Sequence, residues 1–110
     1  DWDYQNGKTA LLFQNETKRL SYITTVDSEN KEPNYSEFEN NNAKCIRIID
    51  GHVCVLGKDG ITQYNFKGGS EKKISSEGSY EEMIYIDDYI FLLGYDRIDR
   101  IDYKSGRMRR

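Results

Sequence analysis

One order of apolar segments and turn residues occurs twice between residues 45 and 107, at a spacing of 37 residues. At that spacing Asp50 aligns with Asp87, and Leu56-Gly57 aligns with Leu93-Gly94. The apolar positions align as well: Ile46 with Met83, Ile49 with Ile86, Val53 with Ile90, Cys54 with Phe91, Ile61 with Ile98 and Phe66 with Tyr103. A repeat of this length is one supersecondary unit that buries its apolar surface against its neighbours, so the sequence predicts an array of similar units in contact.

The composition of each unit predicts β-strands and gives almost no support to helices. In the first unit Asp50-Gly51 is a strong signal for a two-residue hairpin turn. Alternation in the last apolar run of that unit predicts that Thr62, Tyr64 and Phe66 face the core. The expected strands are Cys45–Ile49, His52–Leu56, Ile61–Phe66 and, weakly, Lys73–Ser75, followed by Met83–Ile86, Tyr89–Leu93 and Ile98–Tyr103.

The first 42 residues are less regular, and we expect an irregular β segment there. Leu11–Phe13 and Leu20–Val26 have the composition of strands. Asp1–Lys8 resembles Ile101–Arg107, which predicts that the chain opens inside a unit. Residues 27–42 hold few apolar groups, so we expect a mobile polar loop there. The chain then divides into 1–42 and 43–110, and the second part contains two units at about 45–81 and 82–110.

Four short strands in about 40 residues, repeated, are typical of the blades of a β-propeller. The segments Val53–Ile61 and Tyr89–Ile98 resemble the repeats of bacterial propellers of the pyrroloquinoline-quinone-like and NHL-like types. The resemblance implies an all-β fold of antiparallel, propeller-like blades, with about two and a half repeats of ~37 residues. It implies no quinone cofactor, because the tryptophans and the Ala-x-Asp-x-x-Thr-Gly signature of those blades are absent. We therefore expect no cofactor.

About two and a half blades cannot close a ring, and three arrangements follow from this length. The chain is a fragment of a larger propeller, or copies of the chain assemble into one, or its strands form a small open β-sheet or barrel. In the second case the protein is a homo-oligomer; in the first, neighbouring blades come from the rest of a longer chain.

Length and charge exclude several classes of function. A chain of 110 residues is at most one domain, and its net charge of −3 argues against a nucleic-acid partner, which needs a basic face. No apolar run approaches the roughly 18 residues of a membrane span. The chain begins at Asp1 without a leader and looks processed or excised, so the missing signal peptide is no evidence for the cytoplasm. We expect a secreted or membrane-anchored extracytoplasmic protein. The glycosylation sequons at Asn15 and Asn34 add only faint support.

The two cysteines match neither a redox pair nor a zinc-ligand set, because eight residues lie between Cys45 and Cys54. A turn at Asp50-Gly51 pairs Arg47 with Cys54, which places Cys45 diagonal to Cys54. We expect two reduced, mostly buried thiols; the alternative is a disulfide with distorted geometry.

The other chemical groups also favour a non-catalytic chain. His52 lies beside a turn, with no nucleophile assigned to it. Asp96, Asp99 and Asp102 lack the spacing of a calcium loop, so we interpret them as turn-forming and edge-protecting residues and expect no metal site.

Binding residues of propellers collect on loops, and by position these loops hold six candidate residues. We predict a non-catalytic binding module for a protein or glycan partner, since tyrosine and arginine dominate recognition surfaces. The alternatives are a partial domain of a propeller enzyme acting on carbohydrate, and a structural module that extends another protein's sheet. The candidate binding residues are Lys58, Asp59, Tyr80, Tyr95, Asp96 and Arg97.

Overall fold

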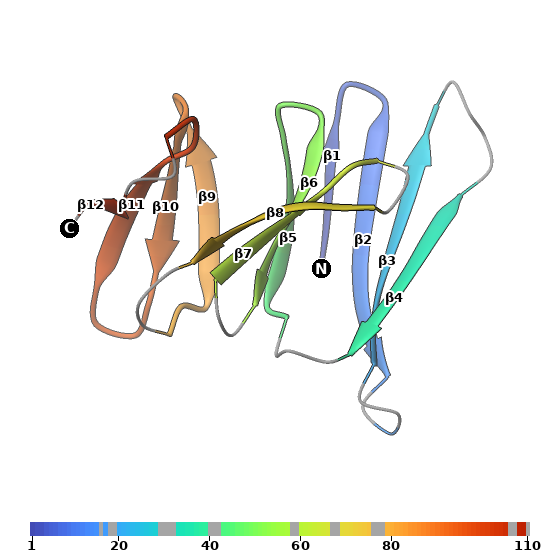
Figure 1. Cartoon of the computed structure of the whole chain (residues 1–110), viewed down its shortest axis with the longest axis horizontal. Coiled ribbons are helices and arrows are strands. Elements are labelled where there is room, and N and C mark those ends of the chain that lie inside the picture. The colour runs from blue at the N-terminus through green and yellow to red at the C-terminus, as the bar shows by residue number, and fades with distance from the viewer. Residues whose placement is uncertain are drawn as a thin grey trace.

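The computed structural model describes residues 1–15, 17, 20–28, 33–39, 43–57, 60–66, 69–75, 79–105 and 108–109. Within these residues the chain is all-β, as predicted, and its strands form three four-stranded antiparallel sheets (Figure 1). In each sheet the order runs from one edge strand to the other, so the described strands form no closed barrel. No apolar helix of membrane-spanning length occurs in this part of the chain.

Each sheet is a meander of four consecutive strands. The first sheet contains β1 (Trp2–Gln5), β2 (Lys8–Asn15), β3 (Leu20–Asp27) and β4 (Asn34–Glu39). The middle sheet contains β5 (Cys45–Ile49), β6 (His52–Gly57), β7 (Gly60–Tyr64) and β8 (Ser70–Ser75). The third sheet contains β9 (Glu82–Ile86), β10 (Tyr89–Leu93), β11 (Ile98–Asp102) and β12 (Met108–Arg109).

The spacing of 37 residues recurs in the pairing of the strands. Leu56 pairs with Ile61 in the middle sheet, and Leu93 pairs with Ile98 in the third sheet. The first hairpins match in the same way, because Ile49 pairs with His52 and Ile86 pairs with Tyr89. The sequence repeat is therefore a repeat of strand register as well as of composition.

The first two strands of every sheet are joined by a two-residue turn in which both residues have positive φ. The φ values are 51° and 80° at Asn6-Gly7, 52° and 77° at Asp50-Gly51, and 50° and 67° at Asp87-Asp88. This is the backbone that a type I′ turn requires, and it matches the twist of the strands it joins. The match of Asp1–Lys8 to Ile101–Arg107 was wrong: β1 takes the same place in its sheet as β5 and β9.

The segment 27–42, expected to be a loop, contains the strand β4. Thr24 pairs with Tyr35, and Leu20 pairs with Glu39. The composition gave little sign of this strand because an outer strand is stabilised by backbone hydrogen bonds to its neighbour, which need no apolar alternation.

The middle sheet packs between the other two sheets, and alternate residues of its strands enter two different cores. Ile46 and Ile48 of β5 pack with Leu12 and Ile23 of the first sheet, while Cys45 and Ile49 pack toward the third sheet. The first core holds Ala10, Leu12, Ile23, Ala43, Ile46, Ile48, Val53 and Val55. The second holds Cys45, Ile49, Cys54, Leu56, Ile61, Ile74, Tyr80, Met83, Ile90, Leu92, Ile101 and Tyr103.

The prediction named one core face for β7, whereas the structure has a core on each face and the other face is the more buried one. The side chains of Ile61 and Gln63 are buried, and the Oε1 atom of Gln63 accepts a hydrogen bond of 2.7 Å from the Tyr103 hydroxyl. Tyr64 and Phe66 are only partly buried, against the core shared with the first sheet. The alternation rule failed here because both faces of the middle sheet are covered.

Substitutions at Gly51 test the shared turn geometry. A Cβ atom at Gly51 would meet only Lys8 Nζ, at 3.9 Å, so backbone strain at φ +77° is the main cost. We expect Gly51→Ala to lower the free energy of unfolding by about 1 kcal/mol. Gly51→Asn should cost clearly less, because asparagine tolerates this region. Equal losses in denaturant titrations of the two variants would contradict a type I′ turn here.

Candidate functional site

The first strands of the three sheets lie side by side. β5 contacts β1 and β2 on one side and β9 on the other. β1, β5 and β9 run in the same direction, and their turns lie at the same end of the molecule (Figure 1). Residues at matching positions of these strands are therefore brought together from distant parts of the chain.

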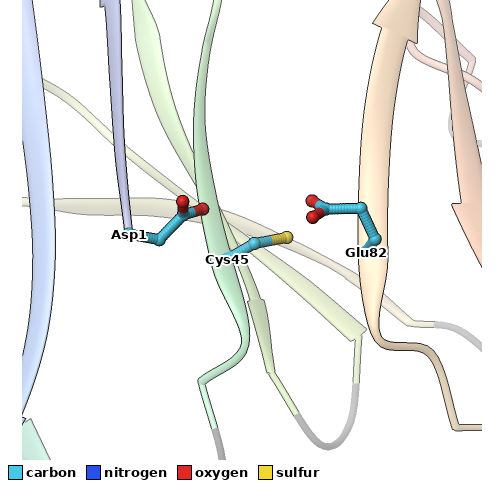
Figure 2. A group of neighbouring side chains, drawn as sticks. All are labelled: Asp1, Cys45 and Glu82. Carbon is cyan, nitrogen blue, oxygen red and sulfur yellow. The ribbon is translucent and has the colours of Figure 1, made fainter.

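Asp1, Cys45 and Glu82 are such a set of matching positions. The spacings of 44 and 37 residues between them are those that separate the three hairpin turns. Their side chains converge, with the ligand atoms of all three within 4.8 Å of one another. Figure 2 shows Asp1 beside β1, Cys45 on β5 and Glu82 on β9, with the three side chains directed into one space. We call this group the axial cluster.

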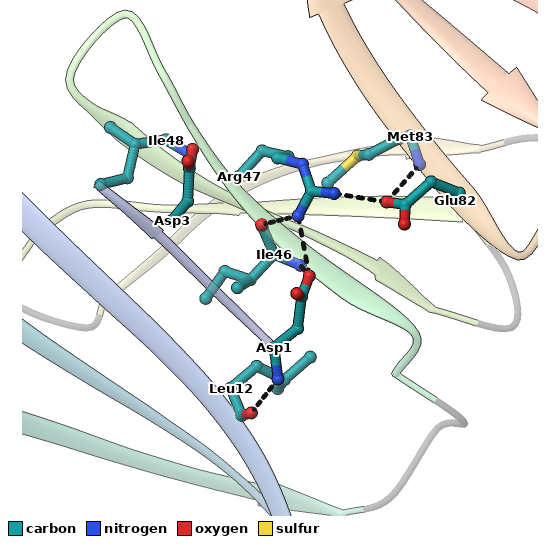
Figure 3. A network of polar contacts seen from close by, with 8 residues as sticks. All are labelled: Asp1, Asp3, Leu12, Ile46, Arg47, Ile48, Glu82 and Met83. Atoms are coloured by element: carbon teal, nitrogen blue, oxygen red, sulfur yellow. Dashed lines mark hydrogen bonds and ion pairs between the residues drawn. The ribbon is translucent and has the colours of Figure 1, made fainter. Parts of the chain in front are cut away.

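Arg47 of β5 links the two carboxylates of the axial cluster (Figure 3). Its guanidinium donates to Asp1 Oδ2 at 2.7 Å and to Glu82 Oε1 at 2.6 Å, and it also donates to the Ile46 carbonyl at 2.6 Å. The Arg47 side chain is 23% exposed, which makes this a partly buried network that spans all three sheets. Two charge-assisted hydrogen bonds thus connect elements that are 46 and 35 residues away in the sequence.

The carboxylates of Asp1, just before β1, and Asp3, in β1, accept hydrogen bonds from backbone N–H groups at the unpaired edge of β5. The Ile46 N–H donates to Asp1 Oδ2 at 3.1 Å, and the Ile48 N–H donates to Asp3 Oδ2 at 2.8 Å (Figure 3). These N–H groups point away from β6, so they have no partner in their own sheet. Asp1 and Asp3 therefore cap an edge strand that would otherwise leave buried donors unpaired.

Cys45 holds its proton firmly. Burial, followed by the charge of Glu82 and a hydrogen bond to its carboxylate, raises the pKa of the thiol from 9.0 to about 12. The hydrogen bond from the Met83 backbone and the charge of Arg47 oppose this increase and are smaller. Both cysteines are free and buried, which confirms the expectation of reduced thiols.

The chemistry open to the axial cluster is narrow. A protonated thiol is neither a nucleophile nor a metal ligand. Two close carboxylates are what glycoside hydrolysis needs, but Asp1 and Glu82 are both engaged by Arg47. A cation bound here would have to displace Arg47 and deprotonate Cys45. The contacts indicate a structural role in joining the sheets.

The six predicted binding residues fall into three groups. Lys58 and Asp59 lie outside the described residues. Tyr80 and Arg97 are brought together by Asp99: the Tyr80 hydroxyl and Arg97 Nε both donate to Asp99 Oδ2, the latter at 2.8 Å. Tyr95 and Asp96 are exposed residues of the turn that joins β10 and β11.

Asp99 was expected to be a turn or edge residue, and this was wrong. Its residue is 3% exposed, and Arg97 Nη2 lies 2.5 Å from its carboxylate. Arg97 also lies over the Tyr80 ring, with 5.6 Å from Cζ to the ring centroid. Hydrogen bonding and ion pairing to Asp99 raise the pKa of Arg97. By contrast, Asp102 accepts from the N–H groups of Lys104 and Ser105, as a turn-forming aspartate does.

The turn that carries Tyr95 and Asp96 is closed by a hydrogen bond of 2.9 Å from the Gly94 N–H to the Arg97 carbonyl. Arg97 is held at its other end by Asp99. Tyr95 is completely exposed. We call residues 94–97 the tyrosine turn.

A groove of about 360 Å³ lies where the first and middle sheets meet. It is lined by Asp1, Leu12, Phe13, Gln14, Ala43 and Lys44. Gln14 Nε2 donates to the Ala43 carbonyl at 2.7 Å, and the Lys44 ammonium pairs with Glu81 at 3.5 Å. The four predicted binding residues that the structure describes, Tyr80, Tyr95, Asp96 and Arg97, do not line this groove.

Sequence reasoning missed the axial cluster and Arg47. The signal was present, since aligning Asn6-Gly7 with Asp50-Gly51 also aligns Asp1 with Cys45, and the 37-residue spacing then leads to Glu82. The alignment of Asp1–Lys8 with Ile101–Arg107 hid that relation.

No family model matches this chain, and no curated protein sequence matches it.

Replacing Arg47 tests the network between the sheets. Arg47→Gln keeps much of the side-chain volume but removes the charge shared by Asp1 and Glu82. We expect the free energy of unfolding to fall by about 2 kcal/mol. Lys44→Gln is the control, because its exposed pair with Glu81 should contribute less than about 0.5 kcal/mol. Similar losses for both variants would mean that Arg47 does not join the sheets.

The raised pKa of the Cys45 thiol leads us to expect a loss of stability in alkaline solution. Its pKa is higher in the folded chain than the ordinary value of 9.0, so the folded state holds the proton more tightly. This contribution is complete below pH 9 and is lost between about pH 9 and about pH 12. From pH 8 to pH 10 the free energy of unfolding should fall by about 1 kcal/mol. In Cys45→Ala the same interval should show a smaller fall; an unchanged slope would contradict the assignment.

Proposed function

We propose that this chain is a non-catalytic binding module of the β-propeller type, which takes a protein or glycan ligand. Three features support the propeller-type arrangement. The sheets are four-stranded meanders, they stack face to face, and their first strands lie together and run in the same direction (Figure 1). Propellers combine these features around a common axis.

The observation that carries the binding role is the tyrosine turn. Tyr95 is completely exposed, yet the residues around it are fixed by the Gly94 to Arg97 hydrogen bond and by Arg97 pairing with Asp99. An exposed aromatic ring on an anchored turn makes contacts at low entropic cost. Asp96, beside it, adds a hydrogen-bond acceptor.

The axial cluster supports a binding role over catalysis. Arg47 engages both carboxylates, and the Cys45 thiol stays protonated near neutral pH. A hydrolase that used Asp1 and Glu82 would need one of them free as a general acid or nucleophile.

A ligand screen tests this proposal. The whole chain is applied to a glycan array and to a displayed peptide library, and the best ligand of each is titrated. We expect Tyr95→Ala to weaken binding at least about tenfold, and Tyr95→Phe to retain most of it. Lys104→Ala, which removes an exposed side chain beyond the other end of β11, is the control.

Two results would contradict the proposal. One is a ligand whose affinity is the same for Tyr95→Ala and the unmodified chain. The other is cleavage of an arrayed saccharide that Glu82→Gln abolishes, which would favour the enzyme alternative.

A further inference from the structure

The two outer faces of the sheet stack are apolar and exposed. On the first sheet, Trp2, Tyr4 and Phe13 are 50% to 64% exposed, and Phe13 stacks on Tyr22 with 5.5 Å between ring centroids. On the third sheet, the most exposed apolar residues are Ile84, Ile86 and Ile98, at 40% to 67%. We call these the aromatic end face and the aliphatic end face. Contiguous apolar surface of this kind marks interaction sites.

The aromatic end face has a buried counterpart inside the molecule. At the spacing of 44 residues that separates Asn6-Gly7 from Asp50-Gly51, Trp2 matches Ile46 and Tyr4 matches Ile48. Ile46 and Ile48 are fully buried against the first sheet. In the middle sheet, the positions that match the aromatic end face are thus covered by the sheet that precedes it in the chain.

The aliphatic end face has the opposite counterpart. At the spacing of 37 residues Ile86 matches Ile49, and Ile98 matches Ile61. Phe91 and Leu93, which share this face by strand alternation, match Cys54 and Leu56. All four matching residues of the middle sheet are buried in the core shared with the third sheet. In the middle sheet, the positions that match the aliphatic end face are thus covered by the sheet that follows it in the chain.

Two interfaces of this kind exist inside the chain, one between the first and middle sheets and one between the middle and third sheets. Each end face corresponds to one side of such an interface, and the complementary side is the end face at the opposite end of the stack. We propose that the two faces dock on each other between copies: the aliphatic end face of one copy packs on the aromatic end face of a second copy. The contact continues the two interfaces inside the chain and uses the same positions.

A buried hydroxyl on the aromatic end face supports this contact independently. Thr24 lies opposite Leu11, which itself lies opposite Trp2 across the strands. Thr24 is 6% exposed, and its Oγ1 atom has no hydrogen-bond partner among the residues that the structure describes. On a face exposed to solvent, water would be the hydrogen-bond partner of such a hydroxyl. A second sheet packed on this face can supply the partner that the buried Oγ1 atom lacks.

The docking is heterologous, because two different faces meet, and such contacts form either closed rings or open chains. Two copies would bring six sheets together and cover all four end faces. Six falls within the usual range for propellers. The closure at two copies rests on the propeller-type arrangement proposed above, whereas the contact between end faces does not.

Solution mass tests the contact. Light scattering of the whole chain should give about 26 kDa, twice the 12.9 kDa of one chain, at concentrations near 100 µM. Ile86→Glu and Tyr4→Glu, on opposite end faces, should each shift the mass toward one chain. Both positions are exposed, so each variant should keep the far-ultraviolet circular dichroism of the parent chain. Tyr95→Ala should leave the mass unchanged, which separates this test from that of the ligand site.

Mixing the two charged variants, Ile86→Glu and Tyr4→Glu, tests whether the contact pairs two different end faces. Each retains one intact end face, and these intact faces are complementary, so an equimolar mixture should regain about the mass of two chains. A monomeric parent chain would overturn the proposal. So would a dimer that only one of the substitutions disrupts, because it would be built from one face meeting its own copy. An open polymer that both substitutions disrupt would support the contact and overturn closure at two copies.

Discussion

A β-sheet has two faces, and the middle sheet of this chain has apolar residues on both. Ile46 and Ile48 need a neighbour on one side, and Ile49 and Leu56 need one on the other. At roughly 25 cal/mol per Å² of apolar surface removed from water, neither face can be left in solvent without a large loss of stability. The first and third sheets exist in their positions because they cover these two faces. Everything else in the molecule, including the closeness of the three first strands, follows from that stacking.

The stacking also creates the polar chemistry of the molecule. Where β1, β5 and β9 lie side by side, their N–H groups and carboxylates meet in a partly buried region. Arg47, Asp1 and Glu82 satisfy one another there, and Asp1 and Asp3 satisfy the edge of β5. Hydrogen bonds to charged groups in such surroundings are costly to break, because each leaves a charge unpaired. Apolar stacking thus places the sheets, and these contacts fix which strands lie together.

Much of the fold could be predicted from the sequence, because the signals involved are local. Asp50-Gly51 sets the register of a hairpin by its own φ preferences, and the strands around it follow. The role of Asp99 could not be predicted in this way, since its partners Tyr80 and Arg97 belong to the start of the third sheet and to a turn. Nor could β4, whose pairing depends on β3 and not on its own pattern. Convergence of Asp1, Cys45 and Glu82 is a property of the stack, so local patterns alone do not contain it.

The axial cluster has a consequence for how alike the three units can be. Matching positions on the outer strands of the three units do not lie side by side, so the same residue type can occupy such a position in every unit without contact between the three side chains. At the first strands the three units meet: one residue type at positions 1, 45 and 82 would place three identical groups within 4.8 Å of one another. Three carboxylates there would repel one another, and three thiols would leave Arg47 without a counter-charge. Physical chemistry therefore forces the units to diverge in sequence where they come closest in space, while their outer strands remain free to stay alike.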